Sequence, residues 1–397
     1  MEFKEIIGQE TVKSHLIEMV QQNRLSHALL FLGKEGSGAL PLALAFAQFI
    51  VCQPSKTQQI EDLFGGSIQS DNSSTYKSPE ELTHLDSFQR ANQLMHPDIH
   101  YTYPVYTRKS GEKPKSTDFI KEWREFVKNY PYGNAYDWLQ FIGAENKQGN
   151  ITAEECNDII KQLNLKSFES GYKVLVLWMP EYLGKEGNKL LKLIEEPPVN
   201  TLFILVAENE ELILPTILSR CQLIKIPLLE TKQIAESLEQ KSNVDAVKAQ
   251  QIAAIAEGNY REAIQLLQHN EEDWQQLVKE WLNSTLRGGP IAQVKFTDEI
   301  SKYGREKQKQ FLRYFNHLIE QSIRIKVVGT DVFPIAENEK DFAQRLNKIA
   351  SVSQLQVLIE ELDKACYYIE RNANSKILFQ ALTIKIFHII QNKVTLT

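Results

Sequence analysis

The segment from Ala28 to Leu40, ALLFLGKEGSGAL, contains the pattern that decides the expected fold. Five apolar residues, Ala28 to Leu32, predict a strand buried on both faces, and a glycine-rich turn follows before an apolar helix through Ile50. A strand, a glycine-rich turn and a helix are the parts of a P-loop, in which backbone N–H groups and a helix N-terminus hold phosphates. The sequence therefore predicts an α/β domain with a parallel sheet built around a P-loop.

The chemical groups of a working P-loop are missing from this turn. The pattern GxxxxGK[ST] needs a lysine for the outer phosphates and a hydroxyl for Mg²⁺. Gly33 and Gly38 are present, with Gly36 between them, but Ala39 stands at the lysine position and Leu40 at the hydroxyl position. Each charged contact contributes roughly 1.5 to 3 kcal/mol, so the loss of both groups predicts that the turn does not bind Mg-ATP tightly.

The acidic residue that helps a P-loop ATPase to hold Mg²⁺ is also missing. The apolar strand expected from Tyr172 to Trp178 continues into Met179 and Pro180, and Glu181 is the first carboxylate after it. No Asp-Glu pair ends this strand. We therefore expect the glycines to form a tight strand-to-helix turn that does not catalyse hydrolysis.

Short apolar segments alternate with helical patterns in the first two thirds of the chain, which is typical of a parallel sheet with helices on both faces. The expected strands are Ala28 to Leu32, Ile99 to Tyr103, Tyr172 to Trp178, Thr201 to Ala207 and Gln222 to Ile226. After Pro227 the chain is almost wholly helical. We predict three domains: a sheet domain over residues 1–227, a small helical lid over 228–270 and an all-α domain over 271–397.

Two apolar stripes at helical spacing predict that the last domain is a helix bundle. The stripes consist of Phe311, Leu312, Phe315, Leu318, Ile319 and Ile323, and of Leu355, Leu358, Ile359, Leu362 and Ile369. Taken alone, such stripes favour packing within the chain over oligomerisation.

Two segments interrupt the sheet pattern. Residues 53–78 are rich in Ser, Gln, Asn, Asp and Gly and predict a surface excursion with little core of its own. Residues 108–149 predict an inserted subdomain that folds against the sheet domain, because they are rich in aromatic side chains. These are Trp123, Phe126, Tyr130, Tyr132, Tyr136, Trp138 and Phe141.

Composition excludes several classes of protein. The 397 residues are 42% apolar, and 45 Lys and Arg against 51 Asp and Glu give a formal charge of -6, which excludes a generally basic DNA-coating protein. The four cysteines form no CxxC pair, so reduced thiols are expected. The N-terminus carries acidic residues in place of a signal peptide's apolar core, and no apolar run is long enough to span a membrane. We expect a soluble, cytoplasmic protein with no membrane contact.

Several motifs resemble the clamp-loader branch of the AAA+ family, which includes the delta-prime subunits of bacterial DNA polymerase III. They are GluGluProPro at 195–198, ThrLeuPheIleLeuVal at 201–206 and ProThrIleLeuSerArgCys at 215–221. PheLysGluIleIleGlyGlnGlu at 3–10 and ArgLeuSerHisAlaLeuLeuPheLeuGly at 24–33 look like the opening of that family. The resemblance covers residues 3–226 well and the remainder more loosely.

The Ser-Arg-Cys motif of this family carries an arginine that points from one subunit to the γ-phosphate of ATP in the next. Ser219, Arg220 and Cys221 match the motif. A guanidinium stays charged and can hold phosphate oxygens bidentately. The resemblance therefore implies that Arg220 is an arginine finger supplied in trans. The alternative is a local ion pair, for example with a carboxylate of the acidic run 208–211.

An arginine finger beside a disabled phosphate loop is similar to the delta-prime subunit rather than to the motor subunits. The resemblance implies a subunit of the DNA polymerase III holoenzyme, a DNA-directed DNA polymerase, with no catalytic activity and no cofactor of its own, since ATP is bound by the neighbour. The implied partners are the gamma/tau motor and delta subunits and, through the complex, the sliding clamp and primed DNA.

Two C-terminal segments extend the resemblance. GlyAsnTyrArgGluAlaIle at 258–264 resembles the sensor-2 helix of the family's lid, with Arg261 at the sensing position. Because no nucleotide is expected beside it, we expect Arg261 to be structural. Residues 369–378 resemble the collar domain through which these subunits form a ring.

The sequence also departs from the family. Many delta-prime subunits carry a four-cysteine zinc module after the first P-loop helix, and here only Cys52 is near that place. We therefore expect no zinc, with His84, His96 and His100 as ordinary loop or strand residues. The aromatic insertion is outside the common pattern and receives no predicted role.

Two other functions remain open at this point. One is a motor-type AAA+ ATPase subunit that tolerates unusual motifs, which ATP binding and turnover would reveal. The other is a stand-alone replication factor that binds DNA, which a salt-dependent DNA titration would reveal.

Overall fold

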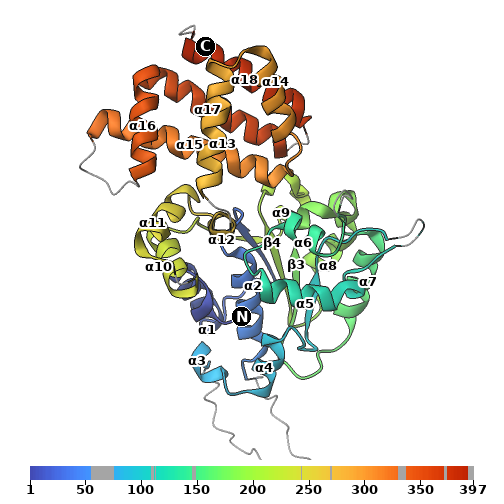
Figure 1. The fold of residues 1–397 in the computed structure, drawn as a ribbon. Coiled ribbons are helices and arrows are strands. Elements are labelled where there is room, and N and C mark those ends of the chain that lie inside the picture. Colours follow the sequence, from blue (N-terminus) through green and yellow to red (C-terminus); the bar gives the residue numbers. More distant parts are fainter. Residues whose placement is uncertain are drawn as a thin grey trace, which may run out of the picture. The chain divides into compact units, whose positions relative to one another are not determined.

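A five-stranded parallel sheet forms the centre of the N-terminal part of the chain (Figure 1). The structure is a computed structural model that describes residues 1–397 except 55–75, 109–110, 112, 145–148, 243, 269–270, 330–336, 371–372 and 392–397. The strands are β1 (Ala28–Gly33), β2 (Ile99–Thr102), β3 (Lys173–Trp178), β4 (Thr201–Ala207) and β5 (Gln222–Ile226). All five predicted strands are confirmed to within one residue at each end.

The strand order is β2-β3-β4-β1-β5, and every strand pair is parallel. In the register of β1, Ala28 lies opposite Phe203 of β4 and Leu29 lies opposite Gln222 of β5. This order places β1 between β4 and the edge strand β5, so the turn that follows β1 emerges from an interior strand at the carboxyl edge of the sheet. Ligand sites of open α/β sheets lie at this edge.

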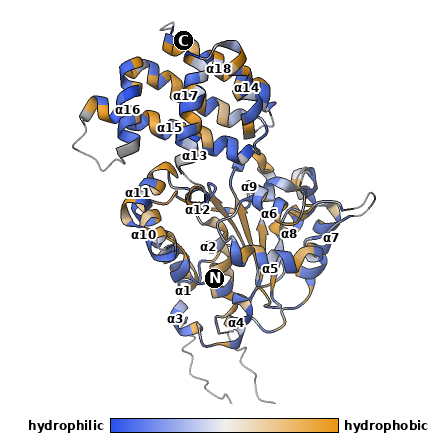
Figure 2. Ribbon diagram, in the orientation of Figure 1, coloured by the Kyte–Doolittle hydropathy of each residue, from blue (hydrophilic) through white to orange (hydrophobic). Residues whose placement is uncertain are grey.

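Helices cover both faces of the sheet, which explains why β1, β3 and β4 are almost continuously apolar (Figure 2). Leu29 and Phe31 of β1 point into one core, while Ala28 and Leu30 point into the other. The first core is shared with η1 (Phe3–Glu5), α1 (Glu10–Gln21), α2 (Ala39–Val51), α3 (Pro79–Leu82), α4 (Asp86–Asn92), η2 (Ser116–Phe119), α5 (Ile120–Asn129) and α6 (Ala135–Phe141). The second is shared with α7 (Ala153–Asn164), η3 (Pro180–Leu190), α8 (Leu191–Glu195) and α9 (Pro215–Leu218). A short η4 (Glu210–Leu212) lies between β4 and α9.

The aromatic segment 108–149 contributes to the first core. Trp123 of α5 stacks on Tyr103 with 4.1 Å between the ring centroids, and Trp138 of α6 donates from Nε1 to the carbonyl of Pro104 at 2.6 Å. Buried Glu155 joins this segment to the sheet, because its carboxylate accepts from Ser116 N–H at 2.8 Å and from the Thr102 hydroxyl at 2.9 Å. The segment is thus anchored next to β2 by both apolar and polar contacts.

Contacts divide the chain into two compact units. Unit 1 comprises Met1–Ser237 and Glu257–Glu262, and unit 2 comprises Leu238–Ala256 and Ala263–Thr397. Helices α10 (Thr231–Ser242) and α12 (Tyr260–Gln268) contribute residues to both units, whereas α11 (Ala246–Ile255) belongs to unit 2. The predicted boundaries of the three domains stay a prediction, while the predicted fold class is confirmed.

Unit 2 is helical throughout its described residues. Its remaining helices are α13 (Glu271–Leu286), α14 (Gly289–Ile300), α15 (Arg305–Val328), α16 (Glu337–Ile349), α17 (Val352–Glu370) and α18 (Ser375–Gln391). Trp281 of α13 is fully buried against Phe311 and Phe379 and donates to the Thr383 hydroxyl at 2.9 Å. The two predicted stripes are buried within the bundle except for Ile323 and Ile359, which are partly exposed. The apolar periodicity therefore served intramolecular packing.

Among the residues that the structure describes, no helix is long and apolar enough to cross a membrane. Nor does that part of the chain contain a group of three or more His, Cys, Asp or Glu side chains placed to hold a metal ion. Most of the predicted surface excursion at 53–78 lies outside the described residues.

We expect Trp123→Ala to lower the free energy of unfolding by about 3 to 5 kcal/mol, because it empties a fully buried ring position. Denaturant unfolding of the whole chain measures this change. The control is Phe168→Ala, whose ring is 82% exposed and whose effect should stay within about 0.5 kcal/mol. Equal stability of the two variants would show that the aromatic segment is not part of the core.

Candidate functional site

The glycine-rich turn has the backbone geometry that its sequence predicts. It connects β1 to α2, and Gly36 and Gly38 have φ angles of 71° and 90°, in the left-handed region that favours glycine. Ala39 and Leu40 begin α2 and are both buried. The two positions that carry the lysine and the hydroxyl in a working P-loop therefore contribute to the apolar core.

Tyr132, from the aromatic segment, lies against this turn. A Cβ atom built on Gly38 would lie 3.0 Å from Cε1 of Tyr132, so the ring contacts the turn closely. The Tyr132 hydroxyl accepts a hydrogen bond from the Ile7 N–H at 2.9 Å, and the side chain is buried. The remaining cavity, which Trp178 and Glu208 also line, has a volume of about 20 Å³. That volume is enough for about one water molecule, so the Tyr132 ring narrows the space beside the turn.

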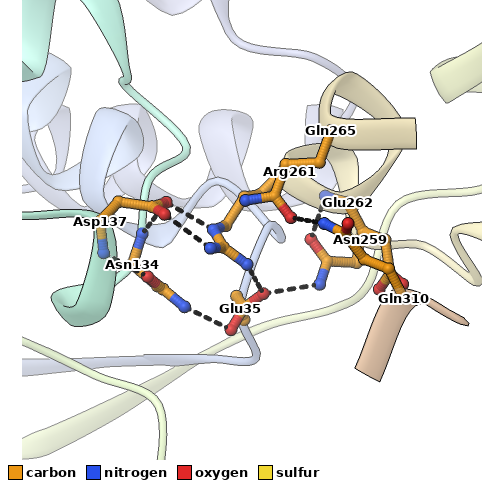
Figure 3. Close-up of polar contacts among 8 residues, drawn as sticks. All are labelled: Glu35, Asn134, Asp137, Asn259, Arg261, Glu262, Gln265 and Gln310. Carbon is orange, nitrogen blue, oxygen red and sulfur yellow. Dashed lines mark hydrogen bonds and ion pairs between the residues drawn. The ribbon is translucent and has the colours of Figure 1, made fainter. Parts of the chain in front are cut away.

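Arg261 contacts two carboxylates beside the turn, those of Glu35 and Asp137, as Figure 3 shows. Its guanidinium is bidentate to Asp137, with Nε at 2.5 Å from Oδ2 and Nη2 at 2.6 Å from Oδ1. Its Nη1 donates to Oε1 of Glu35 at 2.8 Å. The Arg261 side chain is only 5% exposed. The expectation that Arg261 is structural agrees with these contacts, although its role stays a prediction.

Two helix starts orient the carboxylates around Arg261. Asn134 caps α6 by accepting from the Asp137 N–H at 2.9 Å, and Asp137 in turn accepts from the Asn134 N–H at 3.2 Å, which is a reciprocal capping box. Asn259 accepts from the Glu262 N–H at 3.1 Å at the start of α12. Both asparagine side chains also donate to Glu35, from Asn134 at 2.8 Å and from Asn259 at 3.0 Å. Glu35 therefore joins the turn, α6 and the start of α12.

Glu181, the first carboxylate after β3, has a structural partner. Its Oε1 accepts from the backbone N–H groups of Glu208 and Asn209, at 2.7 and 2.9 Å, just beyond the end of β4. Burial raises the pKa of Glu181, and these backbone hydrogen bonds oppose the rise. The carboxylate is thus bound to the connection that follows β4, and its second oxygen, Oε2, has no hydrogen-bond partner among the residues that the structure describes.

Arg220 lies on the surface of unit 1, between α9 and β5. Its side chain is 31% exposed, and Nε donates to Oε1 of Glu195 at 2.7 Å, with Nη2 on the same oxygen. Nη1 donates to the carbonyl of Thr216 at 2.7 Å and to the Ser219 hydroxyl at 3.2 Å. The local ion pair considered as an alternative exists, but its partner is Glu195 and not the acidic run 208–211. Burial raises the pKa of the neighbouring Cys221 thiol to about 11, so this thiol is protonated near neutral pH.

The structure brings together only part of the predicted site. Gly33, Gly36, Gly38, Ala39, Leu40 and Arg261 gather at the carboxyl edge of the sheet. Sequence reasoning missed Glu35, Tyr132, Asn134, Asp137 and Asn259. One signal was available: Asn134 and Asp137 have the spacing of a capping box, which marks the start of α6.

We expect Tyr132→Phe to lower the free energy of unfolding by about 1 to 3 kcal/mol, because the buried Ile7 N–H loses its acceptor while the ring remains. Tyr130→Phe is the control, since its side chain is 50% exposed and the same substitution there should change stability little. Thermal or denaturant unfolding of both variants measures the difference. Unchanged stability of Tyr132→Phe would mean that the hydroxyl does not hold the segment in place.

The chain is similar in sequence to subunits of DNA polymerase III. DNA polymerase III subunit delta' of Bacillus subtilis is 25% identical over 264 residues, which are 66% of this chain and 60% of that protein. DNA polymerase III subunit gamma of Buchnera aphidicola from Acyrthosiphon pisum is 28% identical over 143 residues, which are 34% of this chain and 38% of that protein. The chain thus spans less than two thirds of the length of these relatives.

The chain also aligns with a solved structure and matches a family model. A gamma subunit-related protein of Thermotoga maritima aligns with 94% of this chain and 99% of its own, at 13% identity and a TM-score of 0.38. The family model described as DNA polymerase III, delta subunit, matches residues 8–230, which include β1, the glycine-rich turn and Arg220. On this match, the chain belongs to the DNA polymerase III delta subunit family, as the sequence motifs predicted.

Proposed function

We propose that this chain is the non-hydrolysing delta-prime subunit of a DNA polymerase III clamp loader and acts in the cytoplasm. In this role it supplies Arg220 in trans to the ATP of a neighbouring gamma/tau motor subunit. The complex, which also contains a delta subunit, loads the sliding clamp onto primed DNA. The chain itself positions Arg220 and does not hydrolyse ATP.

One contrast carries this proposal. The chain's own phosphate turn has Ala39 and Leu40 in place of the catalytic groups and is closed by Tyr132, whereas Arg220 remains on the surface. A guanidinium kept at the surface of a chain whose own phosphate site is disabled is suited to a nucleotide bound by another subunit. Membership of the family supports the same role.

The surroundings of Arg220 are compatible with transfer of its contacts to phosphate. Its partner Glu195 is 47% exposed, and a surface ion pair of this kind contributes only roughly 0 to 1 kcal/mol. Both Nε and Nη2 use the same oxygen of Glu195, so the pair lacks the parallel two-oxygen geometry. A γ-phosphate offers several charged oxygens and can therefore replace Glu195 at low cost.

We expect Arg220→Ala to reduce DNA-stimulated ATPase activity and clamp loading by the reconstituted loader by at least about tenfold, since arginine fingers contribute about 10³ to 10⁵ in other phosphoryl-transfer systems. Size-exclusion chromatography should show that the complex still assembles. The matched control is Arg90→Ala, because Arg90 is also exposed and also holds a single glutamate, Glu169. Normal loading with Arg220→Ala would refute the role in trans.

A motor-type ATPase is the rival function, because gamma subunits are among the similar proteins. Titration of the isolated 397-residue chain with Mg-ATP should show no tight binding and no turnover, since the lysine and hydroxyl are missing. Calorimetry and a phosphate-release assay measure these quantities. Tight binding with turnover would establish the motor function.

A steep salt dependence in a parallel DNA titration would instead favour a stand-alone DNA-binding factor.

A further inference from the structure

A buried guanidinium lies beside the glycine-rich turn, where a P-loop holds the phosphates of a nucleotide. Arg261 is 5% exposed, and its partners Glu35 and Asp137 are 23% and 20% exposed. A buried guanidinium without an anion is strongly unfavourable, so Arg261 depends on these carboxylates. All three residues belong to unit 1, although they are far apart in the sequence.

The negative charge that Arg261 needs comes from side chains of the same chain. Glu35 belongs to the glycine-rich turn, and its two oxygens accept from Arg261, Asn134 and Asn259. Asp137 comes from the aromatic segment and binds Arg261 bidentately. In geometry and charge, two carboxylates around one guanidinium resemble the contact of an arginine with phosphate oxygens.

We propose that Glu35 and Asp137 form an internal anion that replaces the phosphates of a nucleotide and latches the segment Glu257–Glu262 onto the glycine-rich turn. We call Glu35, Asp137 and Arg261 the carboxylate latch. It keeps this segment closed on the turn in the absence of any nucleotide. The latch is independent of Arg220, and it gives the aromatic segment a role.

The segment Glu257–Glu262 packs closely on the glycine-rich turn. A Cβ atom built on Gly36 would lie 1.9 Å from Oδ1 of Asn259, so only glycine permits this approach. The Gly36 carbonyl accepts from the Tyr260 N–H at 3.3 Å. The rings of Tyr132 and Tyr260 pack edge to face with centroids 4.8 Å apart. The segment therefore contacts the turn directly, and the aromatic segment covers both.

Hydrogen exchange of the 397-residue chain tests the latch. In the double variant Glu35→Gln and Asp137→Asn, we expect amides of residues 257–262 and 33–40 to exchange at least about tenfold faster than in the wild type, because Arg261 loses both counter-charges. Asp158→Asn is the control, since it removes the charge of a pair with Lys115 whose atoms are 3.3 Å apart, and it should leave both segments unchanged. The single variant Asp137→Asn is measured in parallel and should show a smaller acceleration in the same segments, which tests the latch if the double variant does not fold.

A second readout separates a latch from an ordinary structural ion pair. Loss of both carboxylates should release the segment Glu257–Glu262 from the turn and let inorganic tripolyphosphate reach Arg261. Tripolyphosphate should then restore slow exchange and raise the Tm of the double variant, because its charge can replace the two carboxylates. The wild type should not respond to tripolyphosphate. Wild-type exchange in both latch variants, or fast exchange that tripolyphosphate does not reverse, would overturn the proposal. These measurements use the isolated chain, so they are unaffected by the outcome of the Arg220 experiment.

Discussion

The closure of the glycine-rich turn depends on one electrostatic requirement: the buried guanidinium of Arg261 must have negative partners. In a nucleotide-binding P-loop the negative charge comes from phosphate, and the protein supplies N–H groups and a lysine. Here the protein supplies carboxylates from Glu35 and Asp137, and Tyr132 occupies the adjacent space. Arg261 needs no phosphate in this arrangement, because the two carboxylates already supply its counter-charge. The site can then be packed as protein interior, with Ala39 and Leu40 in the core.

This arrangement separates two functions that one P-loop subunit usually combines. The turn and its surroundings stabilise unit 1, whereas the proposed contribution to ATP hydrolysis is assigned to Arg220, on another part of the same unit. Glu181 also has a structural contact, since its carboxylate accepts hydrogen bonds from the backbone N–H groups of Glu208 and Asn209 beyond β4. A subunit whose sheet domain is held closed by its own side chains can present a surface arginine in a constant position, which suits a stationary member of a moving assembly.

The sheet could be predicted almost completely from the sequence, because strands covered on both faces are continuously apolar and are easily distinguished from amphipathic helices. The core of unit 2 was predictable for the same reason, through the stripe that contains Phe311 and Phe315. The group of polar residues around Arg261 could not be predicted in this way. Its members come from residues 35, 132–137 and 259–261, and a sequence does not show which distant polar residues meet. The partner of Arg220 was also missed, since Glu195 is separated from it by the whole of β4.

The position of Leu40 has a consequence for how this site could change over evolutionary time. Exchanging Ala39 and Leu40 for lysine and threonine would restore the letters of the motif, but both side chains would then enter an apolar interior. The phenol ring of Tyr132 would still fill the space, and the carboxylates would still neutralise Arg261. A working P-loop would therefore need substitutions in the turn to be combined with substitutions in the aromatic segment. Nucleotide binding is thus difficult to acquire by single steps.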